Sequence, residues 1–133
     1  MCIRVALSNK VDLVVHDEHE HVTIINRVCA RKLDLPIYIF HALMRYYEHI
    51  YNAMYNTEHG TDLQPSIGRG IELCHFLDVF TDLLDDEGKA KLTMFMPTQT
   101  MYLNIEEFSQ LRNQYQTHVQ HIECQPHYKQ LID

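Results

Sequence analysis

The sequence predicts an α+β fold in which a small antiparallel sheet packs against about three amphipathic helices. Short β-branched runs occur near the start of the chain, and three longer segments carry apolar residues at intervals of three or four. Of the 133 residues, 46% are hydrophobic, which is enough for a packed core. We therefore expect one domain spanning residues 1–133, a length that is ordinary for a single domain.

Three β-strands are expected in the first part of the chain. In the second of them, apolar side chains stand at alternating positions, as they do in a half-buried strand. The polar residues 17–20 (DEHE) follow as a turn, so the histidine-rich segment 16–21 (HDEHEH) caps a hairpin. The expected strands are 3–7, 11–15 and 21–26.

Two long helices are expected in the middle of the chain. The first begins at Pro36, which suits a first helical turn, and ends at Gly60, a residue that commonly terminates helices. The second follows Ser66, a candidate N-cap, and its apolar stripe runs from Ile67 to Leu84.

The last third of the chain predicts two short strands and a third helix. Residues 91–96 and 100–103 are strand-like runs separated by a proline. Asn104 and Glu107 then have the spacing of a capping box, and helical apolar spacing continues to Ile122.

One sequence pattern occurs twice. Residues 35–47 and 103–115 share L-x-I-x-x-F-x-x-L-x-x-x-Y, and each follows a strand-like stretch, which suggests repeat-like halves at about 11–57 and 91–123. The alternative is chance, since amphipathic helices often share such spacing. The strand-to-helix pattern L-x-x-x-x-F-x-x-L is also similar to one in the single-strand-binding fold of the transcription coactivator family, whose basic, aromatic strands this sequence does not display.

Composition argues against several classes of protein. A net charge of -7 disfavours general electrostatic binding to nucleic acid or an anionic membrane. The four cysteines at positions 2, 29, 74 and 124 form no CxxC, and no apolar run approaches the roughly 20 residues of a membrane span. The first ten residues are too polar for a signal peptide, so we expect a cytoplasmic protein with reduced thiols.

Histidines provide the only candidate metal site. His16, His19 and His21 lie at the predicted hairpin tip, and His118 and His121 share one face of the third helix. Imidazole ligands suit Zn²⁺ or another transition metal. The alternative is a polar turn and a polar helix surface that face water, in which case no cofactor is expected.

Tyrosines predict a surface for a protein partner. Three tyrosines of the first helix recur at i, i+4 and i+8, and two more flank that line. Tyrosine is enriched at protein interfaces, although the same line also suits a helix packed on its own sheet. The tyrosines are Tyr38, Tyr46, Tyr47, Tyr51 and Tyr55.

One basic cluster is visible in the sequence. Arg27, Arg31 and Lys32 lie close together in the chain, and Arg45 follows on the first helix. These cations provide a candidate phosphate contact, or they form ion pairs with nearby acids.

These patterns favour a small acidic, non-enzymatic interaction protein, such as an adaptor, inhibitor or regulator, that binds a protein partner or forms a homodimer. No P-loop, GxSxG or dinucleotide motif supports catalysis. The first alternative is a transition-metal-binding protein that uses the histidines. The second is a single-strand nucleic-acid-binding protein that uses strand aromatics and the basic cluster.

Overall fold

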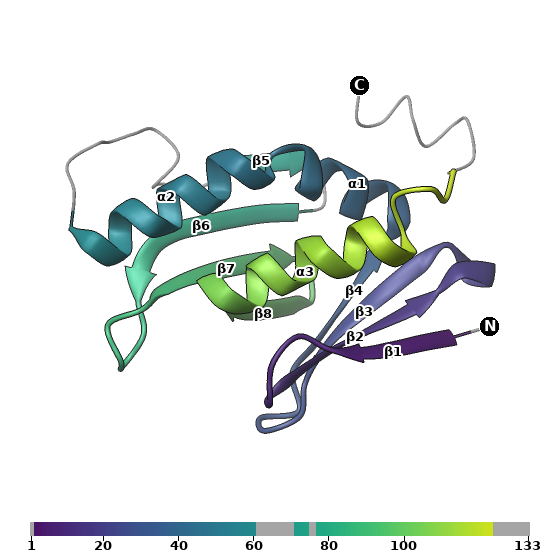
Figure 1. Ribbon diagram of the computed structural model, residues 1–133, viewed down its shortest axis with the longest axis horizontal. Helices are drawn as coiled ribbons and strands as arrows, with labels where there is room; N and C mark the ends of the chain where they lie inside the picture. Colours follow the sequence, from purple (N-terminus) through teal and green to yellow (C-terminus); the bar gives the residue numbers. More distant parts are fainter. Residues whose placement is uncertain (1, 61–70, 75–76, 124–133) are drawn as a thin grey trace.

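Two four-stranded antiparallel sheets and three α-helices make up the computed structural model, which describes residues 2–60, 71–74 and 77–123 (Figure 1). The α+β class predicted from the sequence is confirmed, but the strands form two sheets and not one. In chain order, four strands precede α1 and α2, and four further strands precede α3. Whether this shared order reflects a duplication stays a prediction.

The first sheet, sheet A, is a meander in which each strand pairs with the next. Its core face carries aliphatic side chains from the two central strands, such as Leu13 and Ile24, which are fully buried. His16 pairs with His21, so the HDEHEH segment forms a hairpin tip as predicted, through a short 3-10 helix at Asp17–His19. The strands are β1 (Cys2–Ala6), β2 (Val11–His16), β3 (His21–Asn26) and β4 (Lys32–Pro36).

The first predicted helix is present as two helices, α1 (Ile37–Arg45) and α2 (Tyr47–His59). Pro36 ends β4 and is the N-cap of α1, so it lies one position before the first turn in which the sequence placed it. After the break at Tyr46, α2 crosses the second sheet, whereas α1 contacts sheet A and the first strand of the second sheet. Gly60 ends α2 with a left-handed φ of 65°, as expected for a C-terminal glycine.

The second predicted helix is wrong, because its described residues form strands β5 (Ile71–Cys74) and β6 (Leu77–Leu84). In β6 the side chains of Leu77 and Val79 are buried, whereas those of Asp78 and Asp82 are exposed, which is the period of two that a strand requires. Positions four apart fall on one face of either structure, so the apolar spacing alone did not separate them. The candidate N-cap Ser66 lies outside the described residues.

The second sheet, sheet B, is also a meander, and its last two strands were predicted. The helix α3 (Ile105–His118) follows it directly and ends four residues earlier than the apolar spacing indicated. The strands of sheet B are β5, β6, β7 (Ala90–Met96) and β8 (Gln99–Asn104).

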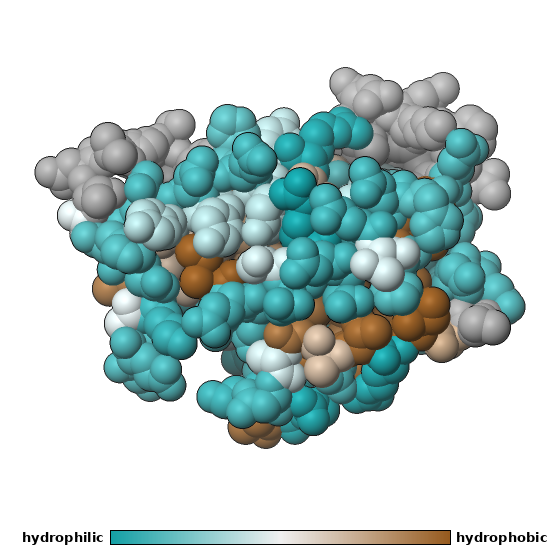
Figure 2. Space-filling view, viewed as in Figure 1, coloured by the Kyte–Doolittle hydropathy of each residue, from teal (hydrophilic) through white to brown (hydrophobic). Residues whose placement is uncertain are grey.

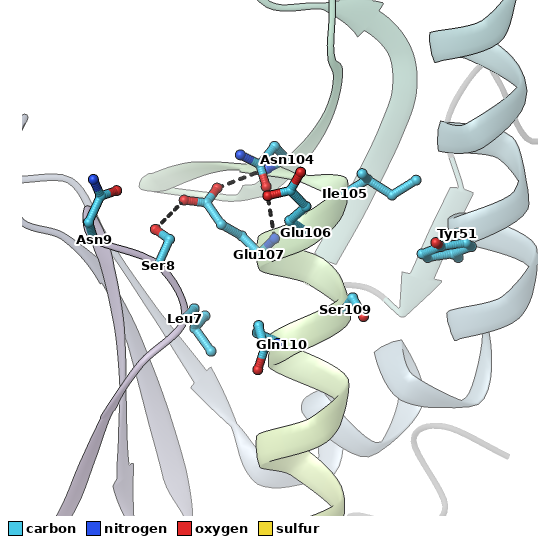
Figure 3. A pocket seen from close by; sticks show the side chains of 10 residues that line it. All are labelled: Leu7, Ser8, Asn9, Tyr51, Asn104, Ile105, Glu106, Glu107, Ser109 and Gln110. Atoms are coloured by element: carbon cyan, nitrogen blue, oxygen red, sulfur yellow. Dashed lines mark hydrogen bonds between the residues drawn. The ribbon is translucent and has the colours of Figure 1, made fainter.

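The predicted capping box at the start of α3 is confirmed. The side chain of Asn104 accepts a hydrogen bond of 2.8 Å from the backbone N–H of Glu107, whose own carboxylate accepts one of 2.9 Å from the backbone of Asn104. Glu107 also accepts a hydrogen bond of 2.6 Å from the Ser8 hydroxyl (Figure 3). Glu107 therefore joins the β1–β2 turn to the start of α3.

A single hydrophobic core lies between the helices and the two sheets. Phe40 of α1 and Phe108 of α3 are its largest fully buried side chains. Hydrophilic side chains cover most of the helix surface that faces the viewer, while hydrophobic ones are visible in a band between α3 and β1 (Figure 2). Among the described residues, no helix combines the length and apolar character needed to cross a bilayer.

The two sheets meet where β4 lies next to β8. The backbone N–H of Asp34 donates a hydrogen bond of 2.8 Å to the side-chain oxygen of Gln99, and the Gln99 amide donates one of 3.2 Å back to the Asp34 carboxylate. This reciprocal pair fixes the edge of sheet A against the edge of sheet B. We call the line along β4 and β8 the seam.

Candidate functional site

Aromatic and basic side chains gather on the outer face of sheet B. In β7, Leu92 and Met94 point into the core, so their neighbours Lys91 and Phe95 point outward. The register brings residues of β6 and β8 to the same outer face. We use the name platform for the surface formed by Phe80, Lys91, Thr93, Phe95 and Tyr102.

Phe80 and Phe95 contact each other on the platform. Their ring centroids lie 5.5 Å apart at an interplanar angle of 81°, which is the edge-to-face geometry that aromatic pairs prefer. Phe95 remains 40% exposed, which is high for a phenylalanine in a central strand. The chain therefore presents a large aromatic surface to solvent in the middle of a sheet.

Two cations lie over the ring of Tyr102. The Lys91 ammonium is 4.7 Å from the ring centroid, and the Arg31 guanidinium is 5.0 Å from it. Both distances are within the range in which the ring quadrupole attracts a cation. Arg31 belongs to the turn before β4, so sheet A supplies one cation and sheet B supplies the other cation and the ring.

Thr93 occupies the centre of the platform, opposite Phe80 on one side and Tyr102 on the other. It is only 2% exposed, and its hydroxyl oxygen has no hydrogen-bond partner within the part of the chain that the structure describes. A buried polar atom without a partner destabilises a protein by about 1–3 kcal/mol. The platform thus contains an unused hydrogen-bonding group beneath its aromatic surface.

Charge is distributed unevenly around the platform. Its β8 side is basic, with Arg31 and Lys91 at Tyr102 and the exposed Lys32 at the start of β4. On the other side, β6 exposes Asp78 and Asp82. An anionic ligand is therefore attracted to the part of the platform beside Arg31 and Lys91, and is repelled from β6.

The predicted basic cluster is divided in the structure. Arg31 and Lys32 lie beside the platform, whereas Arg27 forms an ion pair of 3.4 Å with Asp12. Arg45 lies at the far end of α1, about 12 Å along the helix axis from its first residue at 1.5 Å per residue. It lines a separate cavity of about 380 Å³ together with Arg112.

The three tip histidines lie close together. The rings of His16 and His21 stack at 4.3 Å, and those of His19 and His21 are 6.2 Å apart. Because imidazole lone pairs lie in the ring plane, stacked rings direct them along parallel lines and not toward one point. The sulfur of Cys2 also lies 3.0 Å from Nδ1 of His16.

The helix histidines do not complete a metal site with those at the tip. His118 is the last residue of α3, and His121 follows it outside any helix. Across residues 2–60, 71–74 and 77–123, no three His, Cys, Asp or Glu side chains are arranged to hold a metal ion. The metal alternative therefore has no donor set in the described chain.

The crowded surroundings of His16 at the hairpin tip determine the direction in which its pKa is shifted. Burial lowers the pKa of His16, and the adjacent His21 and His19 lower it further, while Asp34 opposes them. The Asp34 carboxylate accepts a hydrogen bond of 2.6 Å from the Thr23 hydroxyl in addition to the one from Gln99. Nε2 of His16 lies 3.5 Å from the Thr23 hydroxyl oxygen, so polar side chains connect the tip to the seam through Thr23 and Asp34.

The five predicted interface tyrosines fall into two groups. Tyr38 is only 8% exposed, and Tyr47 stacks on the buried Phe108 at 4.8 Å; Tyr51 is half-buried. Tyr46 is 41% and Tyr55 47% exposed. The first group packs mainly within its own chain. The second group, Tyr46 and Tyr55, lies on the solvent-exposed side of the helices.

Sequence reasoning missed the platform residues. Lys91, Thr93 and Phe95 alternate with buried Leu92 and Met94, so the polar and aromatic outer positions were visible in the sequence once the segment was taken as a strand. Phe80 was missed because its segment was assigned to a helix. No protein-family model matches the chain, and comparison with curated proteins and with solved structures found no match.

Proposed function

We propose that this protein binds single-stranded nucleic acid on the platform of sheet B. The observation that carries the proposal is the ring of Tyr102 on a solvent-facing sheet, with Arg31 and Lys91 over it. In the bound state Arg31 and Lys91 move from the Tyr102 ring to the adjacent phosphates, and bases stack on Tyr102 and on the Phe80–Phe95 pair. Aromatic stacking combined with a basic path for the backbone is the general chemistry of single-strand binding.

The net charge of -7 limits the part of the surface to which phosphate can bind, but it does not contradict the proposal. Only the β8 side of the platform attracts phosphate, so the phosphates lie beside Arg31 and Lys91, and only the bases reach the Phe80–Phe95 pair next to Asp78. A duplex stacks its bases internally and offers no free ring faces to the platform. We therefore expect binding to single strands and much weaker binding to the duplex of the same sequence.

The direct test measures the affinity of a fluorescently labelled oligonucleotide of about 12 nucleotides, as DNA and as RNA, by anisotropy at low salt. Tyr102→Leu is expected to weaken binding by roughly 5- to 150-fold, because base–aromatic stacking contributes about 1–3 kcal/mol per base. Comparing the affinities for the DNA and the RNA oligonucleotide shows which sugar the site prefers.

The matched control is Tyr55→Leu, which removes an exposed tyrosine of α2 that lies away from the platform. Thermal unfolding followed by circular dichroism checks that both variants fold. Equal losses in the two variants, or no binding of any single strand to the unmodified protein, would refute the proposal.

A second candidate function is the interaction module favoured by the sequence, acting as a homodimer or with a protein partner. The exposed apolar side chains favour it, because Leu83 is 51% and Leu84 50% exposed at the end of β6. Large apolar side chains gathered on a surface commonly mark protein interfaces. Sedimentation equilibrium of the protein and of Leu83→Asp tests it. A monomer at every concentration removes the homodimer.

A further inference from the structure

A cavity of about 740 Å³ opens at the end of the seam, between the tips of two hairpins. Sheet A contributes His19, His21 and Asp34, and the β7–β8 turn contributes residues Met96–Gln99. Its volume is within the range of small-molecule sites, about 300–1,000 Å³. None of the platform side chains lines this cavity, although strand β8 contributes residues to both.

The cavity and the platform are neighbours along the seam. Arg31 contacts Tyr102 at one end, and Asp34 is hydrogen-bonded to Gln99 three residues further along both strands. Three residues of strand span about 10 Å at 3.3 Å per residue. Because three is an odd offset, Gln99 projects from the face of β8 opposite Tyr102, so a single strand that stacks on Tyr102 reaches the cavity by passing around the β7–β8 turn.

The walls of the cavity are suited to a planar ring. The His21 ring is held in place by stacking on His16 at 4.3 Å, and Tyr38, Pro36 and Met96 add apolar surface. Histidine and tyrosine rings are among the side chains on which unstacked bases rest. The cavity thus offers a fixed aromatic wall and an apolar floor.

The polar groups of the cavity accept hydrogen bonds more than they donate them. Each Asp34 oxygen already accepts one hydrogen bond, from Thr23 or from Gln99, and each retains a second lone pair. Glu20 adds a second carboxylate to the lining. Carboxylates repel phosphate and accept from amino groups, so the cavity selects the edge of a base and not the backbone.

We propose that this cavity binds one base of the strand held on the platform, and that it prefers a base with an exocyclic amino group. The inference rests on the proposed function, because the platform delivers the strand. In this arrangement the base stacks on His21 and donates its amino hydrogens to the Asp34 carboxylate. Thymine and uracil, which lack an amino group, are disfavoured at this position.

The test uses 2-aminopurine, a fluorescent base with an exocyclic amino group, placed in turn at each position of an oligothymidine of about 12 nucleotides. The chain contains no tryptophan, so protein fluorescence does not interfere. Stacking quenches the probe. We expect at least one probe position whose quenching is lost in His21→Ala, and a neighbouring position whose quenching is lost in Tyr102→Leu.

Two further variants keep the result interpretable. His49→Ala, at an exposed position of α2 away from the cavity, is the matched control and is expected to leave every position quenched. Thr98→Trp, at the exposed rim, places a bulky ring in the cavity and is expected to displace the base without removing a contact of the fold; its probe is read at excitation wavelengths beyond tryptophan absorption.

The outcomes separate the two proposals. If Tyr102→Leu abolishes quenching while His21→Ala and Thr98→Trp change nothing at any position, the platform binds the strand and the cavity does not. If Tyr102→Leu changes nothing, the platform proposal itself fails. Equal affinity for an adenine-containing strand and for oligothymidine in the unmodified protein overturns the amino-group preference.

Discussion

Thr93 shows at the scale of one residue how the platform differs from an ordinary sheet surface. Its hydroxyl is buried without a partner among the described residues, so Thr93→Val removes an unsatisfied polar atom at nearly constant volume. We expect this variant to be more stable than the unmodified protein by about 1 kcal/mol in urea unfolding. Thr23→Val is the control, because Thr23 is also buried but its hydroxyl donates a hydrogen bond of 2.6 Å to Asp34. Stabilisation by both substitutions would contradict the explanation.

Asp34 makes stability depend on pH. Burial raises its pKa, but hydrogen bonds from Thr23 and Gln99 outweigh burial and hold the pKa below its ordinary value. A carboxyl with a depressed folded pKa stabilises the protein above its unfolded pKa, and this contribution is lost as pH falls through the folded pKa. Asp34→Asn is therefore expected to flatten the acid side of a plot of unfolding free energy against pH. Gln99→Ala, which removes one of the two hydrogen bonds to the Asp34 carboxylate, should flatten that side in part.

At the scale of the element, the start of α3 is the best-predicted feature of the chain. Its capping box could be recognised in the sequence because the contacts join residues three positions apart. Asn104→Ala is expected to lower the unfolding free energy by about 1 kcal/mol, the usual effect of losing an N-cap side chain. Chemical denaturation measures this loss. Ser109→Ala, at a half-buried position within the same helix, is the control and should have a smaller effect.

The elements that were not predicted share a physical reason. The segment of β6 repeats apolar residues at positions compatible with both a strand and a helix, so local spacing did not decide between them. The interruption at Tyr46 was also invisible, since both flanking segments are strongly helical and the break separates a helix that contacts both sheets from one that crosses sheet B. Tertiary contacts decided both cases.

At the scale of the whole molecule, the platform depends on a contact that no local pattern encodes. Arg31 and Tyr102 are far apart in the chain, and only the meeting of β4 with β8 brings them together. The sequence indicated the basic cluster and the strand containing Tyr102, and it placed the histidines at a hairpin tip. It did not show that these three features adjoin one seam.

Salt dependence tests the electrostatic side of the platform as a whole. The logarithm of the binding constant for a single strand falls with the logarithm of salt concentration by about 0.7 for each phosphate neutralised. Lys91→Gln is expected to weaken binding and to reduce this slope by about 0.7. Lys10→Gln, in the β1–β2 turn, is the control. An unchanged slope in Lys91→Gln would show that Lys91 does not contact phosphate.

The seam has a thermodynamic consequence. Because one cation over Tyr102 comes from sheet A and the ring from sheet B, neither half of the chain holds a complete site by itself. A ligand that requires both sheets binds the native state and not the unfolded chain, so it adds about 2.7 kcal/mol to the unfolding free energy at a concentration roughly 100 times its dissociation constant. On the proposed function, ligand binding to the platform and the association of the two sheets are therefore thermodynamically coupled, so each nucleotide bound also stabilises the contact between them.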